Sequence, residues 1–146
     1  MRRRSETGTA LIEVTWLSIL LLIPLLYILL AVFEVQRSAF AVSAAARSAG
    51  RAYATSPDEA SAMARASAAA NVAMEDQHLD LGLTSLKVNC TPDPTNCLGP
   101  GSVINIEVTH PVALPLMPSA LGGNTPSIRV EGAHSVPYGT FREDRS

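Results

Sequence analysis

The chain has 146 residues and a formal net charge of −2, and 47% of its residues are hydrophobic while 5% are aromatic. This length suits one small domain plus an anchor rather than a multidomain enzyme. A slightly acidic chain with few aromatic side chains lacks both the positive surface and the stacking platforms of nucleic-acid-binding proteins. We therefore expect no nucleic-acid partner.

An uncharged apolar run covers residues 14–33 and has about the length that an α-helix needs to cross a bilayer. Three arginines precede it at residues 2–4, and three more follow it within residues 37–51. The first cluster is denser, and positive charge favours the cytoplasmic side of a membrane span. We predict a single-pass protein of the cell membrane with a cytoplasmic N-terminus and an extracytoplasmic C-terminal part.

Glu13 stands at the mouth of this run, where an ionised carboxylate is costly beside hydrocarbon. A plain membrane anchor has no need of this charge. A cleavable secretory signal is the alternative interpretation, because Ala39, Phe40 and Ala41 form the A-x-A triplet that signal peptidase prefers. The length of the apolar run and the position of Glu13 argue against it.

Residues 34–54 are rich in alanine and free of proline, so the membrane helix should continue well beyond the bilayer and occupy residues 9–55 as one helix. Small residues on this stretch allow close helix packing, with apolar contacts expected from Phe40, Val42 and Tyr53. The small residues are Ala41, Ala45, Ala49, Gly50 and Ala52.

Residues 56–82 predict a second helix that runs to about Gln77. Ser56 is the expected N-cap, Pro57 suits the first helical position, and Glu59 completes a capping box. The residues expected near one face are Met63, Ala66, Ala70 and Met74.

Residues 83–146 predict a small exported β domain with a polar, frayed tail. Apolar residues alternate in about three short stretches, which indicates an antiparallel sheet. The alternating residues are Leu86, Val88 and Cys90, then Ile104, Ile106 and Val108, then Ile128, Val130 and Val136. The fold class expected is therefore a membrane-anchored α+β protein.

Cys90 and Cys97 bracket a turn-rich segment, and no second cysteine pair or nearby histidine completes a zinc site. We expect them to form a disulfide if this part is exported. His78, His110 and His134 stand apart, with His110 at the expected end of a strand. No motif with a catalytic mechanism is present. We expect no enzyme activity, metal or cofactor.

Residues 1–8 form a short basic leader that ends in Gly8, and T-A-L-I-E, which runs from Thr9 to Glu13, and the apolar run follow it. This arrangement resembles the processing site of type IV prepilins. The resemblance implies that a prepilin peptidase cuts after Gly8, so that Thr9 becomes the mature N-terminus and Glu13 its fifth residue. In that class the carboxylate pairs with the new α-amino group of a neighbouring subunit, and each charge then neutralises the other in a low-dielectric bundle.

Two further signatures, F-E-V-Q-R after the run and A-A-A-R-S-A-G-R-A beyond it, are similar to the TadE-like family of tight-adherence (Flp) pilus assembly proteins. The resemblance covers residues 5–54. It implies a minor pseudopilin or assembly factor in the membrane or the pilus. Its implied partners are a prepilin peptidase, other pilins or pseudopilins, the pilus assembly platform and membrane lipid. Val14 and Thr9 depart from the aromatic residues common at these positions in the family and in other prepilins.

Two other functions remain open from the sequence. One is an uncleaved bitopic membrane protein whose exported domain is a binding or sensory module. The other is a secreted enzyme or hydrolase fragment released after Ala41. The mature N-terminus separates them: Thr9 indicates the pilin, an intact start indicates the anchor, and Val42 indicates secretion.

Overall fold

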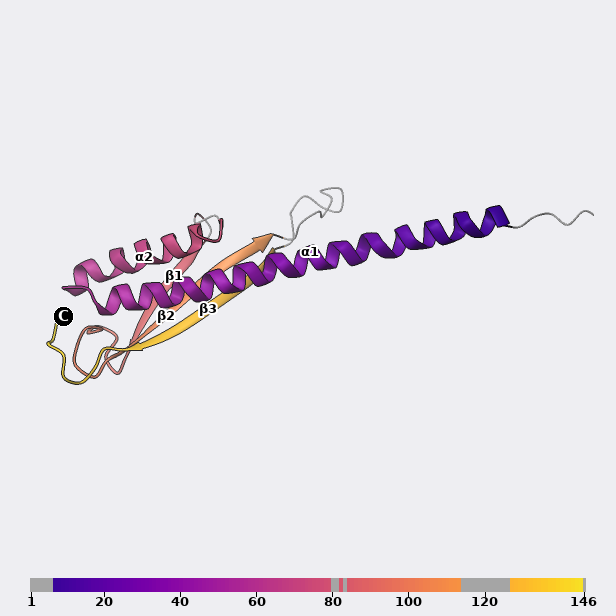
Figure 1. Ribbon diagram of the computed structural model, residues 1–146. Helices are drawn as coiled ribbons and strands as arrows, with labels where there is room; N and C mark the ends of the chain where they lie inside the picture. The colour runs from indigo at the N-terminus through magenta and orange to yellow at the C-terminus, as the bar shows by residue number, and fades with distance from the viewer. Residues whose placement is uncertain (1–6, 80–81, 83, 114–126, 146) are drawn as a thin grey trace, which may run out of the picture.

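The computed structural model describes residues 7–79, 82, 84–113 and 127–145. A long apolar N-terminal helix, a second helix and an antiparallel sheet make an α+β fold, which confirms the predicted class (Figure 1). The elements are α1 (Thr7–Ala54), α2 (Glu59–Glu75), β1 (Ser85–Thr91), β2 (Val103–Ala113) and β3 (Ser127–Pro137).

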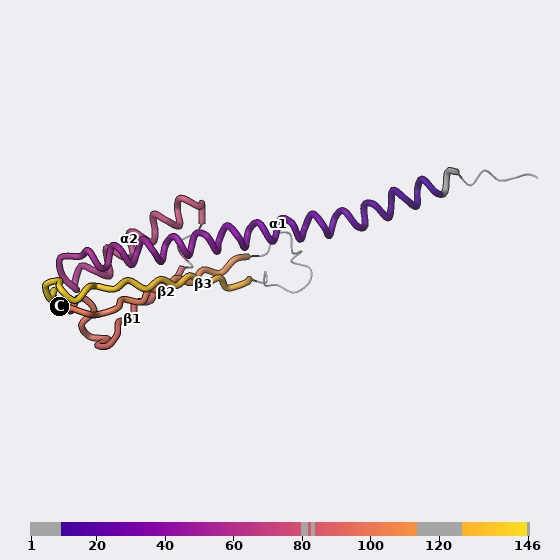
Figure 2. Tube along the Cα trace, turned by 60° about the horizontal axis from the view of Figure 1, so that its bottom comes forward, coloured from indigo at the N-terminus to yellow at the C-terminus, as the bar shows by residue number. Residues whose placement is uncertain are grey.

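Helix α1 continues without interruption from the apolar run into the alanine-rich stretch, as predicted. Its N-terminal part projects away from the rest of the molecule, while α2 packs along one side of its C-terminal part and β2 and β3 along another (Figures 1 and 2). Ala41, Ala45 and Ala49 are completely buried there. The small residues therefore serve close packing within this chain.

The sheet has the order β1-β2-β3, and both pairs of neighbours are antiparallel. Alternate residues of β2 are buried beneath the helices, among them Ile104, Ile106 and Val108. Strand β2 is longer than predicted and continues past Pro111. Proline is tolerated at this position because pairing with β1 ends at Thr109, so the last residues of β2 have a strand neighbour on one side only.

Two glycines let α1 approach β3 closely. A Cβ atom at Gly132 would lie 2.7 Å from the carbonyl carbon and oxygen of Val42, and 2.8 Å from the backbone nitrogen of Ser43. A Cβ atom at Gly50 would lie 2.7 Å from a methyl group of Val136. The helix backbone thus rests directly on the strand backbone, a distance that no larger residue at 132 would allow.

The start of α2 differs from the prediction. Asp58 is the N-cap, and its Oδ1 accepts a hydrogen bond of 2.8 Å from the Ser61 backbone N–H. Ser56 is not the cap, because its hydroxyl donates to the Ala52 carbonyl at 2.8 Å and so belongs to the end of α1. Glu59 closes no capping box; its Oε1 accepts from the Cys97 N–H at 3.2 Å.

One face of α2 is buried along a four-residue spacing that begins at Ala62 and continues through Ala66, Ala70 and Met74. Three of the four residues expected on this face are confirmed. The prediction for Met63 is wrong, since this residue is 44% exposed and lies one position away from the buried row.

Cys90 and Cys97 form the expected disulfide, with Cα atoms 5.3 Å apart and both residues buried. In the chain-entropy description, a disulfide that closes a loop this short adds about 2–3 kcal/mol to the free energy of unfolding. The hydrogen bond from Cys97 to Glu59 ties this loop to the start of α2.

Burial raises the pKa of the Tyr53 hydroxyl at the end of α1, and nearby Glu59 raises it further.

The C-terminal tail, which the sequence predicted to fray, is hydrogen-bonded to the domain within residues 142–145. The buried Tyr138 donates from its hydroxyl to the Glu143 carbonyl at 3.0 Å, and the Arg142 guanidinium lies 4.5 Å from the centre of the Tyr138 ring. Arg142 also donates to the Ala54 carbonyl at 2.9 Å, and Arg145 donates to the Ser56 carbonyl at 3.2 Å. The tail therefore satisfies carbonyl groups that the end of α1 leaves without helical partners.

Candidate functional site

The N-terminal part of α1 is an uncovered apolar cylinder. Four consecutive residues, Leu20 to Ile23, are 62–68% exposed, and four consecutive residues point to all sides of a helix. The most apolar window of the helix has a mean hydropathy of 2.7, and none of it is buried within the fold. A helix that is apolar on every side needs lipid or other helices around it. By length and composition, α1 can span a membrane.

Gly8 and Thr9 lie in the first turn of α1, which begins at Thr7. The first four N–H groups of a helix have no hydrogen-bond partner within the helix, so this turn is held by fewer backbone hydrogen bonds than the turns in the middle of α1. Positions 9 and 13 lie four residues apart and therefore on the same side of the helix. The structure thus places the predicted cleavage point one helical turn from Glu13.

Glu13 is exposed, and within the described residues no hydrogen bond or ion pair satisfies its carboxylate. The acid at the other end of the apolar run differs. Glu34 forms an ion pair with Arg37, one turn further on, at 2.6 Å. The run is therefore flanked by one paired and one unpaired acid in this part of the chain.

Of the three apolar residues expected to make packing contacts after the apolar run, two are buried and one is exposed. Val42 and Tyr53 are buried in the domain core, as expected. Phe40 makes no such contact, since it is 70% exposed on the side of α1 that neither α2 nor the sheet covers. The A-x-A triplet that ends at Ala41 lies in the middle of α1, and Ala41 itself is completely buried.

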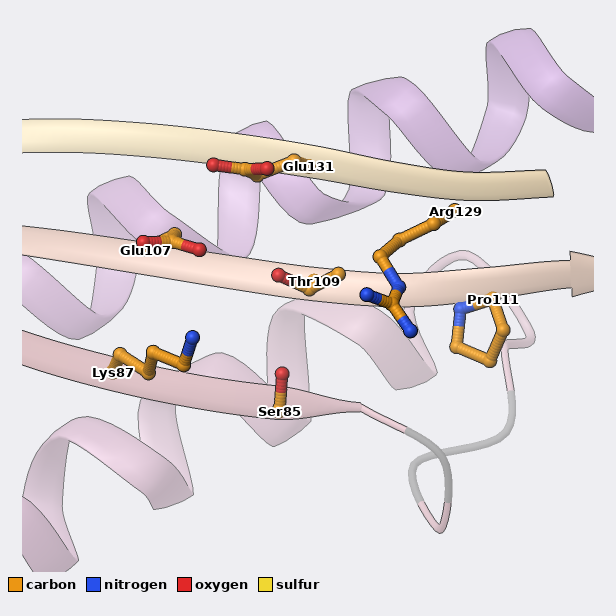
Figure 3. A pocket seen from close by; sticks show the side chains of 7 residues that line it. All are labelled: Ser85, Lys87, Glu107, Thr109, Pro111, Arg129 and Glu131. Atoms are coloured by element: carbon orange, nitrogen blue, oxygen red, sulfur yellow. The ribbon is translucent and has the colours of Figure 1, made fainter.

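The outer face of the sheet carries a polar hollow of about 370 Å³ that the sequence interpretation missed. Figure 3 shows Lys87 on β1, Glu107 on β2 and Glu131 on β3 on this face, with the helices behind it. The full lining is Ser85, Lys87, Glu107, Thr109, Pro111, Arg129 and Glu131. The sequence pattern that could have revealed this face was available, because these polar residues alternate with the apolar residues that indicate the strands. Two cations and two carboxylates suit the binding of a small polar molecule or a peptide.

The histidines are not brought together. His110 lies inside β2 rather than at a strand end, is buried, and shares a hydrogen bond of 2.9 Å with the Thr84 hydroxyl. His78 follows α2 with a φ of 54°. Among the described residues, no group of three or more His, Cys, Asp and Glu side chains could hold a metal ion.

Comparison with models of protein families, with curated proteins and with solved structures finds no match to this chain. The resemblance to the TadE-like family accordingly rests on the signatures within residues 5–54.

Proposed function

We propose that this protein is a minor pilin-like subunit (pseudopilin) or assembly factor of a tight-adherence (Flp) type IV pilus. It acts by helix packing in the membrane or filament and has no enzymatic activity. The observation that carries the proposal is the division of α1 into two halves. The C-terminal half forms the core of a folded domain, whereas the N-terminal half is apolar on all sides and uncovered. Lipid can cover that half before assembly, and helices of neighbouring subunits can cover it afterwards.

The arrangement of Gly8, Thr9 and Glu13 supports processing by a prepilin peptidase. Cleavage after Gly8 would create a positive α-amino group at Thr9, one turn from the exposed carboxylate of Glu13. In a bundle of such helices, an unpaired amine or carboxylate would carry a large desolvation cost. Pairing the amine of one subunit with Glu13 of the next removes that cost and fixes the axial register of the two helices.

The disulfide supports an extracytoplasmic position for the folded domain. Disulfides such as Cys90–Cys97 persist in oxidising compartments and are rare in the cytosol. Together with the arginines before the apolar run, this favours a cytoplasmic N-terminus and an exported C-terminal part.

The ion-pair role can be tested by replacing Glu13 in cells that assemble the pilus. Glu13→Ala is expected to insert and to be processed, yet to be lost from crosslinked complexes with other pilins. Glu13→Gln, which keeps the shape but not the charge, should behave in the same way. Glu34→Ala is the matched control, since Glu34 already has Arg37 as its partner, and it should assemble. Recovery of the Glu13→Ala chain in complexes at the parental level would contradict the proposal.

A second candidate function is an uncleaved bitopic protein whose exported domain binds a ligand. The polar hollow on the outer sheet face favours it, because Lys87, Arg129, Glu107 and Glu131 line one open surface. A mature protein that retains residues 1–8 would support this function over the pilin-like one.

A further inference from the structure

A second hollow, apolar throughout, lies where β3 begins beside α1. It measures about 280 Å³, and Tyr27, Ile28, Val32 and Val35 of α1 line it together with Ile128 of β3. We call it the α1–β3 groove. Ile128 is 45% exposed even though it stands against the helix. The groove therefore leaves an apolar surface open where the sheet meets the long helix.

The position of the groove along α1 matters most. Tyr27 lies six residues before Phe33, the last residue of the apolar run. At a rise of 1.5 Å per residue, that is about 9 Å inside the run. If residues 14–33 cross the hydrocarbon layer, most of the groove lies within the outer part of the bilayer. The end of the sheet, where Val112 pairs with Ile128, must then reach the membrane surface.

We propose that this end of the sheet rests in the outer face of the bilayer and that the α1–β3 groove holds an acyl chain of a phospholipid. This inference rests on the membrane anchoring in the proposed function. The groove opens onto the same uncovered surface of α1 that lipid would surround, so the two apolar surfaces are continuous. The lining presents apolar surface, which suits a hydrocarbon chain, and its one amide residue, Gln36, follows the end of the apolar run.

A cation at the same end of the sheet suits a phospholipid headgroup. Arg129 follows Ile128 on β3, pairs with Pro111 of β2, and is exposed on the outer face (Figure 3). Long basic side chains at a membrane surface keep their apolar stems in the interface and place the charge among the headgroups. Ile128 and Arg129 are adjacent on β3, so their side chains lie on opposite faces of the sheet: Ile128 lines the groove, and Arg129 is exposed on the outer face at the same end of the strand.

The inference can be tested by tryptophan fluorescence of the full chain in phosphatidylcholine vesicles with lipids brominated near the carbonyl end of their acyl chains. The chain has one tryptophan, Trp16, in the apolar run. Trp16→Phe removes it, and Ile128→Trp then places a reporter in the groove. We expect brominated lipid to quench the Ile128→Trp emission and the emission maximum to lie at short wavelength. Phe141→Trp, at a position 102% exposed in the tail, is the control and should not be quenched.

The outcomes separate this inference from the proposed function. Quenching of Trp16 in the parent without quenching of the Ile128→Trp variant would overturn the groove while leaving the membrane anchor intact. An unquenched Trp16 would overturn both. A blue shift that follows protein concentration rather than brominated lipid would assign the groove to a second copy of the chain and contradict the inference. If Ile128→Trp fails to form the Cys90–Cys97 disulfide, Val35→Trp, at another residue that lines the groove and that follows the apolar run, takes its place with the same expectations.

Discussion

Two residues without side chains decide how the long helix meets the sheet. Glycine is unfavourable inside a helix or a strand by roughly 0.5–1 kcal/mol relative to alanine. Gly50 and Gly132 nevertheless occupy such positions, and both lie at the contact between α1 and β3. The close packing of the two backbones explains why the smallest residue is found at each position.

Gly132→Ala should therefore destabilise the domain. The added methyl group would meet the backbone of α1 at Val42, which cannot move aside as a flexible side chain can. Overpacking of this kind costs roughly 1–3 kcal/mol. Denaturant unfolding of the full chain in detergent micelles measures the loss. Ala133→Ser, at an exposed neighbour, is the control and should change stability by less than about 0.5 kcal/mol. Equal stability of the two variants would contradict this account of the contact.

At the scale of elements, α2 shows how a local choice between similar residues sets a helix boundary. Ser56 and Asp58 are both good N-cap residues. The structure assigns the cap to Asp58, because Ser56 is held by the last turn of α1. Hydrogen bonds from Ser61 lower the pKa of the Asp58 carboxyl, so the folded state favours its ionised form.

The stabilisation by Asp58 should therefore depend on pH. With a lowered folded-state pKa, this stabilisation is present above the ordinary carboxyl pKa of 3.8 and is lost as the pH falls through the folded-state pKa. Asp58→Ala should melt at a lower temperature than the parent at neutral pH and approach the parent in acid. Asp58→Asn keeps an acceptor for Ser61 and should lose less at neutral pH. Thermal melts followed by circular dichroism across this pH range measure both; a difference between parent and Asp58→Ala that is constant with pH would contradict the assignment.

The elements themselves could be predicted, since apolar periodicity and alanine content act locally along the chain. The strands around Leu86, Ile104 and Val130 follow from alternation alone. Two features could not be predicted because they depend on contacts between distant segments. The extension of β2 past Pro111 depends on where β1 begins, and the cap of α2 depends on the end of α1.

At the scale of the whole molecule, one helix joins an uncovered apolar segment to a compact domain. The sequence predicted both parts, because an uncharged run and an alanine-rich stretch are unambiguous. It did not predict the docked tail, in which Arg142 and Arg145 reach carbonyl groups of Ala54 and Ser56 almost ninety residues earlier. Nor did it predict the two hollows: the polar one exists only once β1, β2 and β3 lie side by side, and the apolar one only once β3 lies beside α1.

The proposed pilin-like function depends on the bond after Gly8, because cutting that bond would create the α-amino group with which Glu13 is proposed to pair. Mass spectrometry of the protein purified from cells that carry a prepilin peptidase tests this most directly. We predict a mature chain that begins at Thr9, and a chain that retains residues 1–8 when the peptidase is absent. A mature chain that begins at Met1 or Arg2 while the peptidase is active would contradict the account, as would one that begins at Val42.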